Sequence, residues 1–206
     1  EDVRRERRLL AERKDLIDSL SHEMKTPLCV IRAYAEGLQD APEADKQRQY
    51  AQVIVAETQR VNRLITTLLD LSALEAGAVT LSPERFDFVE FVEAVAGRLL
   101  MDAPDVRFQV DYTFPDEPVF VLADKARLEQ AVDNLLVNAK KNTAPGGLLR
   151  LDVKKEGGFV RFSVFNAGPT IPPDILPLIW TKFYRAQGAG YAGSGLGLAI
   201  VAQVLS

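Results

Sequence analysis

Apolar residues recur every seven positions along the first forty residues of the chain. This row comprises Val3, Leu10, Ile17, Met24, Ile31 and Leu38, and a second ladder with three- and four-residue spacings follows at Tyr50, Ile54, Val61, Leu64, Leu68 and Leu71. Such spacing is typical of the buried seam of a coiled coil or a four-helix bundle. The pattern therefore predicts that residues 1–76 are helical almost throughout.

The two ladders are separated by a short turn-forming segment, DAPEAD at residues 40–45. A connection this short makes the two helices antiparallel neighbours. Two helices alone bury one narrow stripe of apolar side chains and leave the rest in water. We therefore expect a symmetric homodimer, in which two helical hairpins complete a four-helix bundle.

The periodicity changes after Gly77, which fits a helix C-cap. A capping box at residues 87–90 predicts a short helix, and a longer helix is expected at about 124–141. Short β-like runs lie at 106–112, 119–122, 148–153 and 159–165. Mixed helices and strands after an all-helical half predict an α+β protein, with a helical domain at 1–76 and a second domain at 77–206.

The composition limits the possible partners. The 206 residues carry a formal net charge of -4, and the sequence pI is about 5.2. This balance argues against a nucleic-acid-binding surface, which normally shows a basic excess. No apolar run approaches the ~20 residues that span a bilayer, so membrane attachment is expected only through a segment upstream of Glu1. The single Cys29 cannot form an intrachain disulfide, which fits a reducing compartment.

The one histidine, His22, is predicted to face outward. With the seven-residue row at position a, His22 falls at position f, on the exterior of a bundle. A neutral imidazole is a competent nucleophile for phosphorus when an acceptor orients its other nitrogen. Glu23 is long enough to be that acceptor or a general base. Pro27 removes a backbone donor and is expected to kink or loosen the helix just after the site.

The segment around His22, SHEMKTPL at residues 21–28, resembles the H-box of bacterial two-component sensor kinases. The resemblance implies that His22 accepts a phosphoryl group and that the acidic residue after it, Glu23, assists the transfer. It also implies that Thr26 helps to position water when the regulator is dephosphorylated. The alternative, an incidental surface histidine, is disfavoured because the motif and the heptad register agree.

The second half of the chain carries a candidate nucleotide site. Asn134 and Asn138 are four residues apart, so both amides project from one helix face, and Lys141 lies near that face. An amide oxygen is a hard ligand for Mg²⁺, and a lysine ammonium binds phosphate as a point charge. A glycine-rich turn at residues 193–197 runs into an apolar helix. Glycines let backbone amides approach phosphate, and the N-terminus of the following helix favours negative charge.

These segments resemble the ATP-binding domain that histidine kinases share with gyrase-type and Hsp90-type ATPases. Residues 134–141 resemble its N-box, residues 166–168 its first glycine box, residues 180–185 its F-box and residues 193–198 its second glycine box. The resemblance implies an α/β sandwich in which helices pack over a mixed sheet, with ATP and Mg²⁺ as cofactors and Asn138 as the Mg²⁺ ligand. The ATP-binding residues that it implies are Asn134, Asn138, Lys141, Asn166, Gly168, Phe183, Arg185, Gly193, Gly195 and Gly197.

Three features depart from the family pattern. The first glycine box normally opens with an aspartate that accepts a hydrogen bond from the adenine amino group. Here Asn166 keeps an oxygen acceptor but lacks the charge, and Thr170 replaces a glycine. If Asn166 merely substitutes as an acceptor for the adenine amino group, aspartate at this position should preserve or tighten ATP affinity. Asn142 stands where an aromatic residue is usual, and the segment 186–192, where the ATP lid belongs, is short and uncharged. The opening asparagine also resembles some sensors of the vancomycin-resistance type.

The sequence as a whole predicts the cytoplasmic catalytic region of a bacterial membrane sensor kinase. It is expected to phosphorylate His22 from ATP and to pass the phosphoryl group to an aspartate on the receiver domain of a response regulator. The second domain must swing to reach His22, which makes residues 73–82 a candidate hinge. The family normally continues through further strands beyond Ser206, so the resemblance also predicts that the chain is incomplete at its C-terminal end.

Two alternatives stay open. One is a scaffold with a degenerate nucleotide site that acts mainly as a dimeric docking platform or as a regulator phosphatase, and the altered first glycine box supports it. The other is an ATPase of the gyrase or chaperone type, which has no use for an exposed histidine on a coiled coil. The stimulus, the regulator and the choice between phosphorylation in cis and in trans are not encoded in recognisable motifs.

Overall fold

A computed structural model gives the structure of the chain. It describes residues 2–40, 43–100, 108–185 and 194–206, without the side chains of residues 2–13 and Asp15. The chain divides into two compact units, Glu1–Ser72 and Ala73–Ser206. The first unit is helical, and the second mixes helices with strands, as the change of periodicity predicts.

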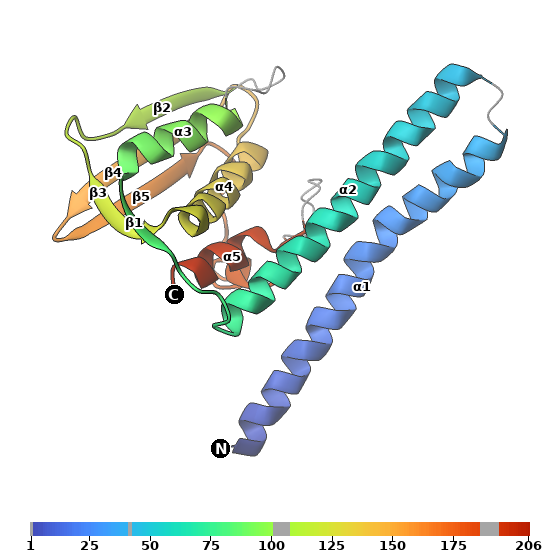
Figure 1. Cartoon of the computed structure of the whole chain (residues 1–206), viewed down its shortest axis with the longest axis horizontal. Coiled ribbons are helices and arrows are strands. Elements are labelled where there is room, and N and C mark those ends of the chain that lie inside the picture. Colours follow the sequence, from blue (N-terminus) through green and yellow to red (C-terminus); the bar gives the residue numbers. More distant parts are fainter. Residues whose placement is uncertain (1, 41–42, 101–107, 186–193) are drawn as a thin grey trace. The chain divides into compact units, whose positions relative to one another are not determined.

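The first unit is built from two long antiparallel helices, α1 (Asp2–Asp40) and α2 (Ala44–Glu75) (Figure 1). Near the turn, the ring of Tyr34 meets the ring of Tyr50 edge-on, with 5.1 Å between centroids. Gly37 allows this approach, because a Cβ at that position would stand 3.0 Å from the Tyr50 ring. Further along α2, Leu64 and Leu71 of the predicted ladder are buried. The predicted helical hairpin is therefore confirmed.

Several large apolar side chains stay uncovered in the single hairpin. Ile17, from the seven-residue row, is 61% exposed, and Val55 and Leu69 on α2 are 55% and 64% exposed. Large apolar side chains at this level of exposure, repeated along two helices, leave a face that a single chain does not bury.

Pro27 lies inside α1 without ending it. The helix continues to Asp40, and the proline ring is buried. Proline lacks the N–H that would otherwise bond to the carbonyl four residues earlier, that of Glu23. The expected local loosening therefore amounts to one missing backbone hydrogen bond in a helix that is not interrupted.

Helix α2 ends in a glycine cap, as the sequence predicts. Gly77 has a φ of 62°. Its N–H donates to the carbonyl of Leu74 and the N–H of Ala78 donates to the carbonyl of Ala73, both at 3.0 Å. This pair of bonds is the Schellman motif, which requires a left-handed residue that glycine adopts without a Cβ penalty.

A mixed three-stranded sheet forms one layer of the second unit. Strand β2 (Gln109–Thr113) runs parallel to β4 (Leu148–Glu156), and β4 pairs antiparallel with β5 (Phe159–Asn166). A separate antiparallel ribbon joins β1 (Pro83–Asp87) to β3 (Phe120–Asp124). The four predicted strands are present with small shifts at their ends, and residues 106–107 of the first predicted run lie outside the described residues.

Strand β1 was not expected from the sequence. Its five residues read PERFD, with a proline and three charges and only one apolar side chain. Such a segment carries no strand pattern of its own. It becomes a strand because β3 supplies a partner, in a register that runs from Pro83 opposite Asp124 to Asp87 opposite Phe120.

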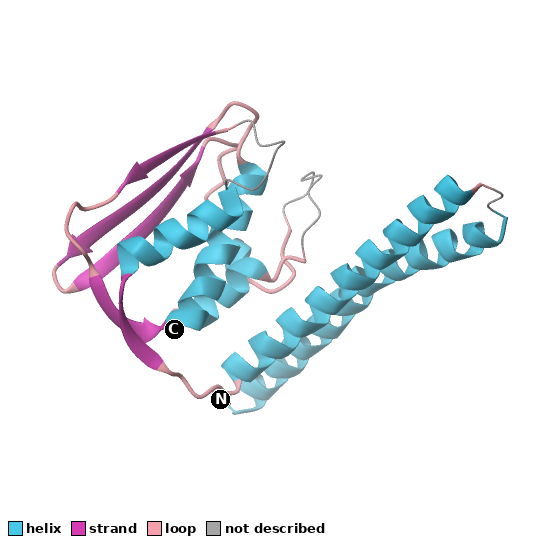
Figure 2. Cartoon of the chain, turned by 45° about the horizontal axis from the view of Figure 1, so that its top comes forward, coloured by secondary structure: helices cyan, strands magenta, loops and turns pink. Residues whose placement is uncertain are grey.

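Helices α3 (Phe88–Leu100) and α4 (Lys125–Asn142) cover one face of the three-stranded sheet (Figure 2). An aspartate immediately precedes each helix and caps its N-terminus. Asp87 accepts a hydrogen bond from the N–H of Val89, and Asp124 accepts one from the N–H of Arg127, each at 3.0 Å. A short 3-10 turn, η1 (Leu178–Trp180), and the final helix α5 (Gly197–Val204) complete the unit, with α5 packed on α4.

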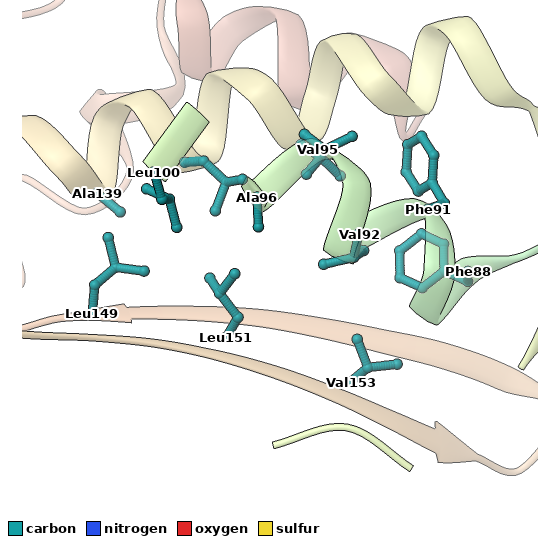
Figure 3. Packing of buried hydrophobic residues seen from close by; sticks show 12 residues of the cluster. Phe88, Phe91, Val92, Val95, Ala96, Leu100, Ala139, Leu149, Leu151 and Val153 are labelled. Carbon is teal, nitrogen blue, oxygen red and sulfur yellow. The ribbon is translucent and has the colours of Figure 1, made fainter. Parts of the chain in front are cut away.

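The core of the second unit lies between these helices and the sheet. Figure 3 shows side chains from α3 pointing down onto Leu149, Leu151 and Val153, which alternate along β4 and are at most 2% exposed. Alternate residues of a strand share one face, so this face is the buried one. The buried members of the cluster are Phe88, Phe91, Val92, Val95, Ala96, Leu100, Val132, Leu136, Ala139, Leu149, Leu151 and Val153.

Candidate active site

His22 lies on α1 with its side chain exposed, as the heptad register predicts. Thr26 is four residues further on and is also exposed, while Glu23 is half-buried. Residues four apart on a helix are neighbours on one face. The imidazole and the threonine hydroxyl therefore share an accessible face of the hairpin.

A groove runs along α1 beside this face. The two cations that line it, Lys25 and Arg32, are exposed, and Arg32 pairs with Glu36 at 3.5 Å on the next turn. Exposed cations beside an exposed histidine suit a partner that carries carboxylates or phosphate. The lining residues are Ser21, Met24, Lys25, Leu28, Cys29 and Arg32.

In the second unit, the N-box residues lie along α4 and meet the second glycine box. The Asn134 side chain donates from Nδ2 to the carbonyl of Gln130 at 2.8 Å. A Cβ on Gly197 would stand 2.8 Å from the Asn134 Oδ1, so glycine at this position lets the Asn134 side chain lie against the start of α5. Asn138 and Lys141, further along α4, are exposed.

The F-box meets the second glycine box through main-chain atoms. The N–H of Phe183 donates to the carbonyl of Gly195 at 2.9 Å. Among the described residues, Phe183 is the one non-glycine residue with a positive φ, 61°. Strained backbone of this kind persists only where its surroundings enforce it, and it is common at functional sites. Gly193 and the expected lid at 186–192 lie outside the described residues.

The first glycine box packs against the C-terminal end of α4. The Asn166 side chain donates from Nδ2 to the main-chain carbonyl of Asn142 at 3.1 Å. Gly168 approaches the same carbonyl so closely that a Cβ would stand 2.0 Å from its oxygen. Because the carbonyl of Asn142 can only accept, the atom of Asn166 that faces it must be the donor nitrogen. The Oδ1 of Asn166 is therefore left to accept a hydrogen bond from another group.

This hydrogen bond changes the expectation for aspartate at position 166. A carboxylate cannot donate, so it would place a negative oxygen against the Asn142 carbonyl instead of an N–H group. The expectation that aspartate preserves or tightens ATP affinity treated Asn166 only as an acceptor. The structure shows that this amide also donates a hydrogen bond, which aspartate cannot do.

The second unit thus gathers the N-box, both glycine boxes and the F-box around the ends of α4 and α5. His22, Glu23 and Thr26 lie on the first unit. Arg185, at the end of the F-box, is exposed. The sequence marked Asn142 only as a departure from the family pattern. In the structure its main chain contacts Asn166, and its side chain contacts Asn138. Its spacing of four residues from Asn138 on a helix is the signal that points to this contact.

A magnesium ion that arrives with a nucleotide fits this unit. In the part of the chain that the structure describes, no three His, Cys, Asp or Glu side chains gather as a metal cluster. A nucleotide-borne Mg²⁺ needs no such cluster, because it keeps several waters and takes most of its other ligands from phosphates. The exposed amide of Asn138 offers a hard oxygen ligand of the type that such an ion accepts.

Two family models match the chain. The model of the His Kinase A (phospho-acceptor) domain matches residues 12–77. The model of the histidine kinase-, DNA gyrase B- and HSP90-like ATPase matches residues 123–206. The first match contains the predicted H-box, and the second contains the predicted N-box, F-box and both glycine boxes.

Individual relatives agree with the two models. The chain is 37% identical to the sensor histidine kinase TrcS of Mycobacterium tuberculosis over 201 residues, which cover 93% of this chain and 39% of TrcS. It is 34% identical to the solved structure of the mycobacterial sensor histidine kinase MprB, with a TM-score of 0.51 over 60% of this chain and 78% of that one. Its fold also matches the histidine kinase ThkA, solved in complex with the response regulator protein TrrA, with a TM-score of 0.69, 24% identity and coverage of 88% of this chain and 54% of that one.

These findings define the class of protein: a region that matches the phospho-acceptor domain of histidine kinases is followed by one that matches their ATP-binding domain. The chain belongs to the sensor histidine kinase family. It spans between 34% and 50% of the length of the curated relatives TrcS, SphS and WalK. None of its described helices is both long and apolar enough to cross a membrane.

Proposed function

We propose that this region phosphorylates its own His22 from ATP and then passes the phosphoryl group to an aspartate on a response-regulator receiver domain. The observation that carries the proposal is the exposed His22, within an H-box on the hairpin, in the same chain as an ATP-binding domain. An ATPase of the gyrase or chaperone type would need no phospho-acceptor region, and the match over residues 12–77 argues against that alternative.

The reaction is an in-line displacement at the γ-phosphorus of ATP. A ring nitrogen of His22 forms the new P–N bond, the bond to the leaving β-phosphate oxygen breaks, and ADP departs. Glu23, next to His22 on α1, serves as the acceptor that orients the imidazole or takes its proton. Most of the rate comes from positioning and from stabilising the transferred charge.

The second unit holds the nucleotide. Asn134 and Lys141 on α4, with the glycine-rich turn that leads into α5, face the phosphates. Asn138 holds Mg²⁺, which neutralises phosphate charge when it is bound. The glycines contribute backbone N–H groups at the start of a helix, where negative charge is favoured.

The base lies against the first glycine box and the F-box. The Oδ1 of Asn166 accepts a hydrogen bond from the adenine amino group. This oxygen is the atom that remains for the base, because the Nδ2 of Asn166 donates to the Asn142 carbonyl at 3.1 Å. Gly168 allows the close backbone approach, and Phe183 and Arg185 complete the nucleotide site. The retained acceptor at Asn166 favours an active kinase over a scaffold with a degenerate site.

Residues 1–76 form the dimerisation and phosphotransfer domain, and residues 77–206 form the catalytic domain, with 73–82 as the hinge. The exposed side chains of Ile17, Val55 and Leu69 support a homodimer, because a second hairpin would cover them. We place the region in the cytoplasm, as part of a longer membrane sensor. The partial coverage of its relatives supports a longer protein.

The receiver domain docks beside His22. Lys25 and Arg32 line the groove along the same helix and complement the acidic side chains that surround a phospho-acceptor aspartate. The solved complex of ThkA with TrrA is a precedent for such a docking in a protein of the same fold. Thr26, on the His22 face, positions the water that dephosphorylates the regulator.

Incubation of the purified chain with γ-labelled ATP and Mg²⁺ tests the proposal. A phosphohistidine is labile in acid and stable in base, so the label is expected to be lost at low pH and kept at high pH. Addition of a cognate receiver domain should then move the label to that protein. A label that survives acid would place the phosphoryl group on a residue other than histidine, and a chain that binds ATP and acquires no label would favour the scaffold alternative.

A further inference from the structure

Asn142 makes two side-chain hydrogen bonds to Asn138, the residue four positions earlier on α4. Its Nδ2 donates to the main-chain carbonyl of Asn138 at 2.8 Å and to the Asn138 Oδ1 at 3.1 Å. One amide group thus contacts both the backbone and the side-chain oxygen of the residue proposed to hold Mg²⁺.

The main chain of Asn142 is held from its other side. Its carbonyl accepts the hydrogen bond from the Asn166 side chain at 3.1 Å, and Gly168 packs so closely that no Cβ would fit beside the oxygen. Since Asn142 is also the last residue of α4, its backbone has little freedom to move. A donor on a fixed backbone is a pre-organised donor, and it loses little entropy when it positions a neighbour.

The bond to Oδ1 bears on metal binding. A side-chain amide can rotate so that its oxygen and nitrogen exchange places, and only the oxygen can bind a metal. A donor beside Oδ1 disfavours the exchanged orientation, because it would bring two N–H groups together. The oxygen has a second lone pair, which stays available for a ligand. Contacts of this kind, one step removed from the ion, orient its ligands and raise metal affinity.

We propose that Asn142 is a positioning residue, which fixes the amide of Asn138 with its oxygen ready for the Mg²⁺ of the bound nucleotide. The proposal rests on the proposed function, since it takes Asn138 as the metal ligand. It also gives a physical role to a residue that stands where the family usually has an aromatic side chain, which has no comparable donor at this point.

A simpler role for Asn142 would be to stabilise the end of the helix, because side chains there often bond back to a carbonyl one turn earlier. Thr143 does so, donating from Oγ1 to the carbonyl of Ala139 at 2.7 Å. Thr143 lies on the same turn, and its hydroxyl bonds to Ala139 rather than to Asn138. It is therefore a matched control for the loss of a helix-end hydrogen bond.

The test compares Asn142→Leu, which keeps the approximate size and removes the donor, with Thr143→Val. ATP affinity is measured by calorimetry for each variant and the parent, in EDTA and across a Mg²⁺ titration. Outer contacts to a metal ligand change affinity by about 10-fold or more. We expect Asn142→Leu to raise the Mg²⁺ concentration needed for half-maximal tightening by about 10-fold, with ATP affinity in EDTA within about twofold of the parent.

Thr143→Val is expected to leave the Mg²⁺ dependence unchanged, although both variants lose a helix-end bond. Asn142→Gln, which retains an amide donor, should recover part of the Mg²⁺ response and keeps the test valid if the leucine variant folds poorly. An Asn142→Leu chain with the parental Mg²⁺ dependence, or with equal losses in EDTA and in Mg²⁺, would overturn the proposal. A parent that binds no ATP at all would instead contradict the proposed function.

Discussion

Phe183 and Gly195 hold each other in left-handed backbone conformations. Their φ angles are 61° and 69°, and the N–H of Phe183 donates to the carbonyl of Gly195 at 2.9 Å. A Cβ on Gly195 would stand 2.7 Å from both the Cα and the carbonyl carbon of Phe183. This contact joins the F-box to the second glycine box, on either side of the residues where the ATP lid is expected.

Alanine at position 195 should therefore cost more than backbone strain alone. Gly146 supplies the control, because it has a φ of 76° and nothing within 4 Å of a Cβ. Gly146→Ala is expected to lower the free energy of unfolding by about 1–2 kcal/mol, the cost of a left-handed residue. Gly195→Ala should lower it by a clearly larger amount and also weaken ATP binding, as measured by urea unfolding and calorimetry. Equal losses in the two variants would contradict the close approach.

The hydrogen bond that the Asn166 amide donates predicts that Asn166→Asp binds ATP more weakly than the parent. Replacing an N–H donor with a carboxylate oxygen beside the Asn142 carbonyl should cost about 1–3 kcal/mol, roughly 5- to 150-fold in affinity. Protonation of the introduced carboxyl restores a donor, so the deficit should shrink as the pH falls toward the ordinary carboxyl range. Calorimetry with ATP at two pH values measures this. Tighter binding by the variant at neutral pH would restore the view that Asn166 is only an acceptor.

The exposed apolar side chains of the hairpin predict how the proposed dimer can be broken without unfolding the chain. Leu69 is 64% exposed in the single chain, so Leu69→Asp should leave the hairpin folded and weaken association by at least about 10-fold, or about 1.4 kcal/mol. Ala56, exposed on a different face of the same helix, gives the control Ala56→Asp. Sedimentation should show a dimeric parent and control and a more dissociated Leu69→Asp. A parent that is monomeric at micromolar concentration would exclude the dimer.

The N-cap of α4 predicts a specific pH dependence of stability. Backbone hydrogen bonds from Ser82 and Arg127 lower the pKa of the Asp124 carboxyl below its usual value. A lowered pKa means that the folded state favours the ionised form, so the stabilisation is complete above the unfolded pKa of about 3.9 and disappears as the pH falls through the lower folded value.

Asp124→Ala should therefore reduce the free energy of unfolding by about 1 kcal/mol at neutral pH. The difference between variant and parent should narrow below about pH 4, in the window set by the lowered pKa. Asp116→Ala, at an exposed position, is the comparison. Thermal unfolding across a pH series measures the effect. A difference that is constant down to strongly acidic pH would show that the charge of Asp124 is not responsible.

Much of this molecule follows from local sequence signals. The heptad row predicts the hairpin and the exposure of His22, and the Gly77 cap marks the end of α2, because each depends on periodicity or on one residue's conformational freedom. Strand β1 could not be predicted, since its residues become a strand only through pairing with β3. The hydrogen bond between the Asn166 side chain and the Asn142 carbonyl could not be predicted either. It joins residues 24 positions apart, and it depends on how a loop packs against a helix end.

His22→Gln removes the side chain that is proposed to receive the phosphoryl group. Glutamine keeps a polar side chain on an exposed helical position, so the fold and the separate ATP-binding domain should be unaffected. We expect this variant to bind ATP with parental affinity by calorimetry and to incorporate no acid-labile label from γ-labelled ATP. Parental labelling of the His22→Gln chain would show that another residue accepts the phosphoryl group.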